Sequence, residues 1–380
     1  MSDSLDEYRQ FSFELIRWYQ KHQRALPWRM TKDPYKIWLS EIILQQTRVD
    51  QGMAYYDKFV KKYPKVNDLA AAEQDEVLKN WQGLGYYSRA RNLHDSAKMI
   101  VNELEGEFPT SYQEIKKLKG VGDYTAAAIA SFAYGEAKAV VDGNVYRLLS
   151  RYFGIEIPID SGAGKKAFAE LAQELIPADQ ADTYNQAIME FGALQCKPKN
   201  PSCSTCPLQP SCVAAHEDKV ASLPIKARKT KVRDRYFHYL ILETVKEVII
   251  RKRSGSGIWQ NLFDFPLIEG DQQLSWKELL PLIREKSMPA VFGASQPAPI
   301  FKLEANSEVR IHLLSHQKLH CKFFHLQLEK KPTAVQADLS IIDKTELGHY
   351  PVPKLIENYL RDETNLLSLF ENKKGSEWRE

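Results

Sequence analysis

Two predicted helices of this chain are joined by the stretch Leu118-Lys119-Gly120-Val121-Gly122-Asp123-Tyr124-Thr125. Its glycines allow a positive φ and a close approach of the backbone to another group. The amides that begin the second helix then point outward, where the helix dipole favours an anion such as a DNA phosphate. Gly120, Val121 and Gly122 are therefore candidate phosphate-binding residues, and the alternative is a plain helix–helix connection.

The segments around this turn are also predicted to be helical, from residue 1 to about 215. Phe11, Leu15, Trp18 and Tyr19 recur at the spacing of one helical face. Further helices are expected at 36–46, 53–63, 68–80, 87–104, 111–118, 123–134, 143–153, 165–176 and 183–194.

From about residue 235 the pattern changes to the β-branched, aromatic and alternating residues of strands. We expect strands at Tyr236–Glu243, Glu247–Arg251, Val309–Leu314 and Lys322–Glu329, and helices near 275–286 and 351–361. The chain then divides into a helical domain at 1–220, a basic linker at 221–235 and a mixed domain at 236–370, an α+β architecture. Within the linker, 226–235 carries six basic residues and one acid, which indicates either a solvated tether or a contact with nucleic-acid phosphate.

Composition excludes several classes of protein. Of the 380 residues, 43% are hydrophobic and 27% charged, as in soluble globular chains. The longest apolar runs are only a few residues, too short for a membrane-spanning helix. The acidic N-terminus does not resemble a secretory signal, so we expect a cytoplasmic protein. The 52 basic and 49 acidic residues leave a net charge of +3, which by itself indicates no partner.

Four of the five cysteines lie close together, at Cys196, Cys203, Cys206 and Cys212, with the spacing C-x6-C-x2-C-x5-C. Four thiolates can hold a zinc ion or a 4Fe–4S cluster. Zinc ribbons usually use two C-x2-C pairs, whereas this stretch has one, so the spacing favours the cluster. Free thiols are the remaining alternative, and Cys321 is expected to be a small core residue.

Glu41 lies in a segment, 35–47, that is apolar nearly all round and is predicted to be a buried helix. Ile37, Trp38 and Leu44 are its neighbours on the helix surface. A carboxyl group in such surroundings has a raised pKa, which suits a general acid near neutral pH. The alternative is a buried glutamate whose hydrogen bonds are satisfied for structural reasons.

Asp142 follows the apolar run Ala139–Val141 and precedes a predicted helix, so it can be an N-cap. A capping aspartate is expected to stay ionised, because backbone amides and the helix dipole favour the charged form. One neutral and one anionic carboxyl group is the division of roles that cleaves a glycosidic bond through a cation-like transition state. Whether Glu41 and Asp142 meet in space does not follow from the sequence.

Several motifs together resemble MutY-type adenine DNA glycosylases of the helix-hairpin-helix superfamily. The matching stretches are Leu26-Pro27-Trp28-Arg29, Trp38–Glu41, Leu44–Thr47, Gly83–Arg91, the turn Gly120–Thr125, Val141–Val145 and the four clustered cysteines. The resemblance implies a two-lobed helical domain with a 4Fe–4S cluster and a C-terminal domain similar to Nudix hydrolases. It also implies a monomer that acts on double-stranded DNA and removes adenine mispaired with 8-oxoguanine or guanine.

The resemblance also implies a mechanism, in which adenine is flipped into a pocket. Glu41 would protonate the base, Asp142 would stabilise the oxocarbenium ion, and Tyr124 and Asn144 would orient the acids and water. The residues expected near the adenine are Arg24, Trp28, Arg29, Leu44 and Gln186, and those expected near the lesion are Gln46 and Tyr86. Each of these seven could instead be structural.

In many relatives a Phe-Ser-His loop reads 8-oxoguanine, and the corresponding stretch here is Leu313-Leu314-Ser315-His316. Ser315 and His316 are therefore candidate lesion-reading residues, although a polar turn at a strand end is the alternative. The stretch Gly257–Phe263 also resembles this domain. The clustered glutamates of a Nudix catalytic box are missing from the sequence, so hydrolysis of nucleoside diphosphates is not expected.

Two other functions compete with adenine excision. Endonuclease III-like enzymes also cut the strand, but they use a lysine at the position of Tyr124, and tyrosine cannot form a Schiff base. A non-catalytic DNA-binding or electron-transfer protein would gain nothing from buried carboxylates at Glu41 and Asp142. The sequence therefore predicts a glycosylase without efficient strand cutting.

Overall fold

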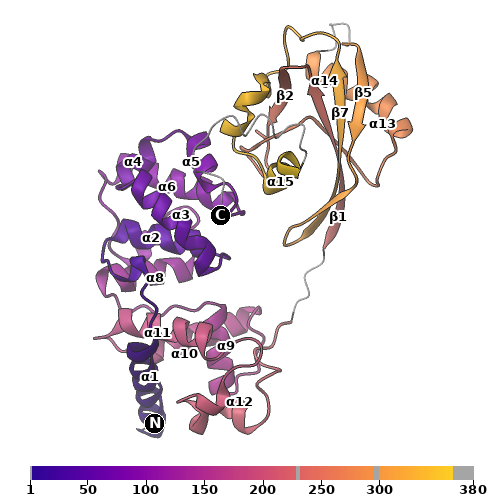
Figure 1. Cartoon of the computed structure of the whole chain (residues 1–380). Helices are drawn as coiled ribbons and strands as arrows, with labels where there is room; N and C mark the ends of the chain where they lie inside the picture. The colour runs from indigo at the N-terminus through magenta and orange to yellow at the C-terminus, as the bar shows by residue number, and fades with distance from the viewer. Residues whose placement is uncertain (1, 228–231, 294–298, 363–380) are drawn as a thin grey trace. The chain divides into compact units, whose positions relative to one another are not determined.

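The computed structural model describes residues 2–227, 232–293 and 299–362. The chain forms two compact units, whose elements are labelled in Figure 1. The first unit consists of Met1–Ala72 and Asn92–Lys229, and the second of Glu73–Arg91 and Thr230–Glu380. Of the ranges expected from the sequence, 228–231 of the linker and 363–370 of the C-terminal domain lie outside the described residues.

The described part of the first unit contains helices and no strands. In chain order the elements are α1 (Ser2–His22), η1 (Pro27–Arg29), α2 (Pro34–Leu44), α3 (Val49–Lys62), α4 (Val66–Ala71), α6 (Ser88–Glu103), α7 (Tyr112–Ile115), α8 (Asp123–Tyr134), α9 (Gly143–Tyr152), α10 (Gly162–Leu175), α11 (Ala181–Leu194), η2 (Cys203–Thr205), η3 (Gln209–Ser211) and α12 (Val213–His216). The boundary between the units at Arg91 falls within α6.

The helices of this unit form two lobes around α8 and α11. Helices α2, α3, α4 and α8 lie in one lobe, and α1, α9, α10, α11 and α12 lie in the other (Figure 1). Helix α8 contacts α2, α7 and α11, because the small buried side chains of Ala126, Ala127, Ala128 and Ala130 let its neighbours approach closely. It ends at Gly135, which adopts the left-handed conformation of a C-cap (φ 73°).

One predicted helix contains two residues that are not helical in the structure. The segment expected at 68–80 is broken into α4 and α5 (Gln74–Trp81), because Ala72 and Glu73 both have extended backbones. Acidic side chains in the first turn of α5, Asp75 and Glu76, favour a new helix start there. Helix α5 belongs to the second unit.

The described part of the second unit contains an eight-stranded mixed sheet with path order β3-β2-β1-β7-β5. Its strands are β1 (Arg233–Glu243), β2 (Glu247–Lys252), β3 (Phe263–Asp264), β4 (Leu267–Gly270), β5 (Phe301–Asn306), β6 (Arg310–Leu313), β7 (Gln317–Leu328) and β8 (Leu339–Asp343). Strand β1 runs parallel to β7, and the other pairs are antiparallel. Four of these strands, β3, β4, β5 and β8, were not predicted, because they are short or carry polar residues.

Helices pack on both faces of the sheet. On one face, Leu279 of α13 (Trp276–Leu282), Ile283 of η4 (Ile283–Ser287) and Phe292 of α14 (Met288–Phe292) join Phe324 in the core. On the other face, Tyr359 of α15 (Lys354–Asp362) stacks on Phe323 with ring centroids 3.6 Å apart. Phe323 and Phe324 are consecutive in β7, so they point to opposite faces. The 3-10 helix η5 (Lys344–His349) follows β8.

The α+β fold class predicted from the sequence is confirmed. Within the described residues, no helix combines the length and the apolar composition needed to cross a membrane.

Candidate active site

A cavity of about 530 Å³ lies between the two lobes of the first unit. It is lined from the region of η1, the C-terminal end of α2, the N-terminal ends of α8 and α9, and one face of α11. Ten of the residues singled out from the sequence line it: Arg24, Trp28, Arg29, Glu41, Leu44, Gln46, Tyr124, Asp142, Asn144 and Gln186. The two carboxyl groups, which are 101 positions apart in the chain, therefore face the same space.

Glu41 is held in this cavity by α2, a helix that is buried along most of its length. The glutamate side chain is itself buried, with 8% of the residue exposed. Burial raises the pKa of the Glu41 carboxyl to about 7, against the hydrogen bond with Tyr124, which lowers it. The nearby Asp142 charge raises this pKa further and Arg29 lowers it. Near neutral pH a large fraction of Glu41 is therefore protonated and can donate a proton.

Tyr124 connects Glu41 to the opposite wall of the cavity. It is the second residue of α8, and its hydroxyl oxygen lies 3.1 Å from the Sδ atom of Met189. Burial raises the pKa of Tyr124 well above 10. The phenol thus stays neutral, and it orients Glu41 without adding a charge.

Asp142 is the N-cap of α9, as the sequence indicates. Its Oδ1 atom accepts from the backbone N–H groups of Asn144 and Val145, each at 2.8 Å. Its Oδ2 atom accepts from the side-chain amide of Asn144 at 2.8 Å. Burial raises the pKa of Asp142, and these three N–H groups lower it. The net effect is a raised pKa, because burial outweighs the three N–H groups, so the expectation that capping keeps this carboxyl group ionised leaves out the larger effect.

Asn144 is fixed by a second residue, Arg147, which the sequence did not single out. The Arg147 guanidinium donates to the Asn144 Oδ1 atom at 2.9 Å. Because a guanidinium can only donate, it orients the Asn144 amide so that its NH₂ group faces Asp142. Arg147 also donates to the carbonyl oxygens of Gly192 at 2.6 Å and Cys196 at 2.8 Å.

Glu190 is the most important cavity residue that sequence reasoning missed. It is 1% exposed and binds the Arg24 guanidinium through two bonds of 2.7 Å. Arg29 donates to the same carboxylate at 3.1 and 2.8 Å. Although burial raises the pKa of Glu190, these two arginines lower it to about 2. Glu190 therefore stays ionised and holds both arginines at the cavity wall.

A pattern in α11 could have revealed Glu190 and Met189. Gln186, Met189, Glu190 and Ala193 are spaced three, four and seven residues apart, so they share one helical face. Gln186 accepts a hydrogen bond of 2.7 Å from the Tyr19 hydroxyl, which fixes its side chain.

The turn at 120–122 lies between α7 and α8. Gly120 has a φ of 75°, and a Cβ there would lie 2.9 Å from the Asn92 side chain, so glycine is required. The N–H of Val121 donates within the turn to Leu118 O at 3.2 Å, and its side chain is buried. A Cβ on Gly122 would meet no atom within 4 Å, so its backbone borders open space.

Three of the predicted site residues, Tyr86, Ser315 and His316, lie in the second unit. Tyr86 is 47% exposed, and its hydroxyl lies 2.9 Å from the Ser315 Oγ atom. Ser315 and His316 are both exposed in the turn between β6 and β7. Tyr86 has a φ of 47°, and Gln46 in the first unit has a φ of 55°, a conformation that non-glycine residues rarely adopt. Such strain is often found in residues that contact ligands.

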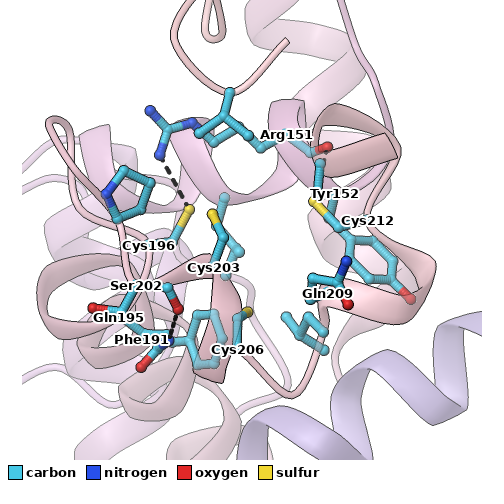
Figure 2. Close-up of a pocket in the computed structure, with 15 residues that line it drawn as sticks. Arg151, Tyr152, Phe191, Gln195, Cys196, Ser202, Cys203, Cys206, Gln209 and Cys212 are labelled. Carbon is cyan, nitrogen blue, oxygen red and sulfur yellow. Dashed lines mark hydrogen bonds between the residues drawn. The ribbon is translucent and has the colours of Figure 1, made fainter. Parts of the chain in front are cut away.

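The four clustered cysteines line one pocket of the first unit. Figure 2 shows their side chains around a common space, with Arg151 at one end. The rest of the wall is largely apolar and includes Leu148, Phe191 and Leu208. The Arg151 guanidinium donates to the Cys196 Sγ atom at 3.4 Å, and backbone N–H groups of Leu208 and Ala215 hydrogen-bond the sulfur atoms of Cys206 and Cys212.

These features fit a metal group that is held by thiolates. Burial raises the pKa of Cys206 to about 11, so a thiolate there needs a positively charged metal group as well as its N–H donor. N–H donors aimed at the sulfur atoms are typical of iron–sulfur sites.

Cys321, in contrast, is fully buried in β7, and burial raises its pKa to about 12. It is a core residue of the sheet, as expected.

Comparisons with known proteins agree with this geometry. Residues 39–177 match the family described as HhH-GPD superfamily base excision DNA repair protein, and residues 238–362 match the NUDIX domain. An adenine DNA glycosylase of Buchnera aphidicola subsp. Baizongia pistaciae is 38% identical, over 69% of this chain and 75% of its own. The adenine DNA glycosylase of Mus musculus is 33% identical, over 85% of this chain and 72% of its own.

Solved structures support the fold of the first unit. A thermostable thymine-DNA glycosylase is 32% identical, with a TM-score of 0.53 over 56% of this chain and 98% of its own. A trapped endonuclease III–DNA complex, at 22% identity and a TM-score of 0.50, shares the fold. It covers 56% of this chain and 98% of its own.

One conclusion follows from the cavity with its two carboxyl groups, from the helical and sheet units, and from the sequence relatives. The chain belongs to the adenine DNA glycosylases, the enzymes of base excision repair that hydrolyse the N-glycosyl bond of adenine.

Proposed function

We propose that this enzyme removes adenine paired with 8-oxoguanine or guanine in duplex DNA and leaves an abasic site. The observation that carries the proposal is the single cavity in which a neutral carboxyl group at Glu41 faces the N–H-bound carboxyl group of Asp142. Its volume of about 530 Å³ can accept a purine nucleoside that has left the base stack.

The first step is protonation of the leaving base. Glu41 donates its proton to a ring nitrogen of adenine, N7 in the family mechanism, and the C1′–N9 bond breaks with its electron pair moving to the base. Tyr124 holds Glu41 in place and contributes no charge of its own. A well-placed general acid contributes about 10²- to 10⁴-fold to the rate.

The second step is capture of the sugar cation. The Asp142 carboxylate stabilises the oxocarbenium ion, and a water molecule adds to C1′ and gives its proton to the Glu41 carboxylate left by the first step. Asn144 keeps Asp142 in position, and its own amide is oriented by Arg147. Ionisation of Asp142 is favoured by its three N–H donors.

Recognition of adenine is assigned to the cavity residues Arg24, Arg29, Gln186, Trp28 and Leu44. The Glu190 carboxylate fixes the guanidinium groups of Arg24 and Arg29, and the Tyr19 hydroxyl fixes Gln186. Trp28 and Leu44 supply apolar wall on which a flat base can pack. Fixed donors and acceptors discriminate between bases better than mobile ones, because less side-chain entropy is lost on binding.

The base opposite adenine is assigned to a different group of residues. Gln46 and Tyr86 are both in the strained left-handed conformation, and we propose that they fill the stack near the lesion. Ser315 and His316 are exposed next to Tyr86 and are proposed to read 8-oxoguanine. Phosphate contacts are proposed at Gly120 and Gly122 and not at the Val121 N–H group, which is already bonded within the turn.

We propose that Cys196, Cys203, Cys206 and Cys212 hold a 4Fe–4S cluster. The support is their shared pocket, the N–H donors at the sulfur atoms and the Arg151 guanidinium. A cluster bound there would supply a fixed charge and would cross-link a loop that contains little regular structure. Purified protein should be brown and contain iron and sulfide, whereas a colourless preparation with zinc alone would contradict the assignment.

The decisive experiment is single-turnover incubation with duplexes that carry adenine opposite 8-oxoguanine, guanine or thymine. We expect abasic product from the first two duplexes and much less from the third, with strand breaks appearing only after alkali. Strand breaks without alkali would instead indicate a lyase, and no base release from any duplex would contradict the proposed substrate.

A further inference from the structure

The stretch Gly257–Phe263 was singled out from the sequence, and neither the cavity nor the cysteine pocket uses it. It lies in the second unit between β2 and β3. Two of its non-glycine residues, Trp259 (φ 60°) and Asn261 (φ 64°), adopt the left-handed conformation. Strain at two positions so close together persists only where surrounding contacts enforce it. The contacts of this loop therefore indicate what it does.

On one side the loop holds the segment Glu73–Arg91. Asn261 Nδ2 donates to the Gln74 side chain at 2.5 Å, and Arg91 donates to the backbone oxygen of Gln260 at 2.8 Å. Just before the loop, Lys252 at the end of β2 binds both carboxylate oxygens of Asp75, at 2.9 and 2.7 Å. These three contacts bind the first turns of α5 and α6. The two turns lie on either side of the segment that carries Tyr86.

That turn is rigid between its two supports. Gly83 (φ 100°), Gly85 (φ 73°) and Tyr86 all have positive φ values. The Gly85 oxygen accepts bonds from Trp81 Nε1 at 3.1 Å and Arg89 at 3.3 Å. The Arg89 guanidinium also lies over the Tyr86 ring. A shift of α5 or α6 therefore moves the Tyr86 side chain with it.

On its other side the same loop holds the hairpin that carries Ser315. The Trp259 ring is 9% exposed and packs edge-on against His312 of β6, with centroids 5.7 Å apart. His312 is three residues before Ser315, and the hairpin is closed by the bond from Leu314 N to Gln317 O at 2.8 Å. One short loop thus contacts the supports of both Tyr86 and Ser315, whose hydroxyl oxygens are 2.9 Å apart.

We propose that Gly257–Phe263, together with Lys252, is a positioning element that sets Tyr86 against Ser315 and so determines the preference for the base opposite adenine. The inference rests on the proposed function, because it assigns a role in specificity to residues that touch no reacting atom. Lys252, Trp259 and Asn261 are positioning residues, and the chemistry in the cavity does not depend on them directly.

The test uses the full-length protein and two duplexes, with adenine opposite 8-oxoguanine and opposite guanine. Lys252→Asp should lower the ratio of the two single-turnover rates about five-fold, the size expected for a partly exposed ion pair. The rate opposite guanine should change little. Asn261→Gly, which tolerates the positive φ and removes the amide, should lower the ratio in the same direction.

Rescue and control variants separate positioning from general damage. The double variant Lys252→Asp with Asp75→Lys should restore the ratio, because it rebuilds the ion pair with its charges exchanged. Lys331→Asp is a matched control, since Lys331 forms its ion pair with Glu247 at the start of β2 and not with Asp75. It should leave the ratio unchanged.

Hydrogen exchange provides a measurement that does not depend on activity. Backbone amides at 82–91 should exchange faster in Lys252→Asp and Asn261→Gly than in the wild type or the Lys331→Asp control. An unchanged rate ratio and unchanged exchange in both variants would overturn the inference and leave adenine excision intact. A wild-type enzyme with no preference between the two duplexes would overturn the proposed lesion specificity itself.

Discussion

The buried carboxyl group of Glu41 in the first unit differs from the buried carboxylates of the second unit. In the second unit, Asp264 accepts bonds from Arg251 and Arg253, and Glu243 binds both His325 and Lys344. In the cavity of the first unit, Glu41 is bonded to a phenol rather than to a cation. A paired carboxylate fixes structure, whereas a carboxyl group without a cation beside it remains able to exchange a proton. The difference marks Glu41, unlike Glu190 with its two arginines, as the carboxyl group of the cavity that can donate a proton.

The largest effect is expected at Glu41. Glu41→Gln keeps the shape of the side chain but cannot donate a proton, so single-turnover excision should fall by about a thousand-fold or more. Affinity for a duplex that contains an uncleavable adenine analogue should remain close to that of the wild type. Substantial residual excision would remove Glu41 from the mechanism and with it the contrast between the units.

The same contrast predicts opposite changes in stability. Asp264→Asn leaves two partly buried arginines without their buried partner and should lower the free energy of unfolding by about 3 kcal/mol. Glu41→Gln should raise it at pH 8 by about 2 kcal/mol, because it removes a buried charge. Denaturant unfolding of both variants checks the signs. If both substitutions destabilise the protein at pH 8, Glu41 is a structural residue.

The pH dependence of stability and of excision follows from the raised pKa of Glu41. Its pKa rises from 4.5 to about 7 in the folded protein, so its contribution to stability is complete below 4.5 and is lost as the pH rises through 7. Excision should follow the protonated form and fall about ten-fold per pH unit above 7. A rate that stays constant between pH 6 and 9 would indicate another proton donor.

The smallest effect is expected in the second unit. Ser315→Ala removes one neutral hydrogen-bonding group beside Tyr86, so the preference for 8-oxoguanine over guanine should fall about five-fold. The rate opposite guanine should be nearly unchanged, which single-turnover assays on both duplexes can measure. A proportional loss on both duplexes would mean that Ser315 supports folding and not lesion reading.

Much of the site could be predicted from local sequence. The apolar helix around Glu41, the capping position of Asp142 and the spacing of the four cysteines are all short-range patterns. The grouping of ten predicted residues in one cavity followed from the resemblance to known glycosylases, since no local pattern brings Glu41 and Asp142 together.

The rest depends on contacts between distant segments. Glu190 looks like an ordinary helix residue until Arg24 and Arg29 pack against it, and Arg147 gains its role only where α9 meets Gly192 and Cys196. The break between α4 and α5, and the membership of Glu73–Arg91 in the second unit, depend on packing against the sheet unit. Short strands such as β3 (Phe263–Asp264) exist only because longer neighbours pair with them.

The two oxygens of Asp142 are not equivalent in the capped helix. Oδ1 accepts from two main-chain amides at the first turn of α9, while Oδ2 accepts from the side-chain amide of Asn144. A sugar cation that bonds to Oδ2 would displace one side-chain donor and leave the end of the helix intact. The fold can therefore offer one face of this carboxylate to the substrate without loosening the element that carries it.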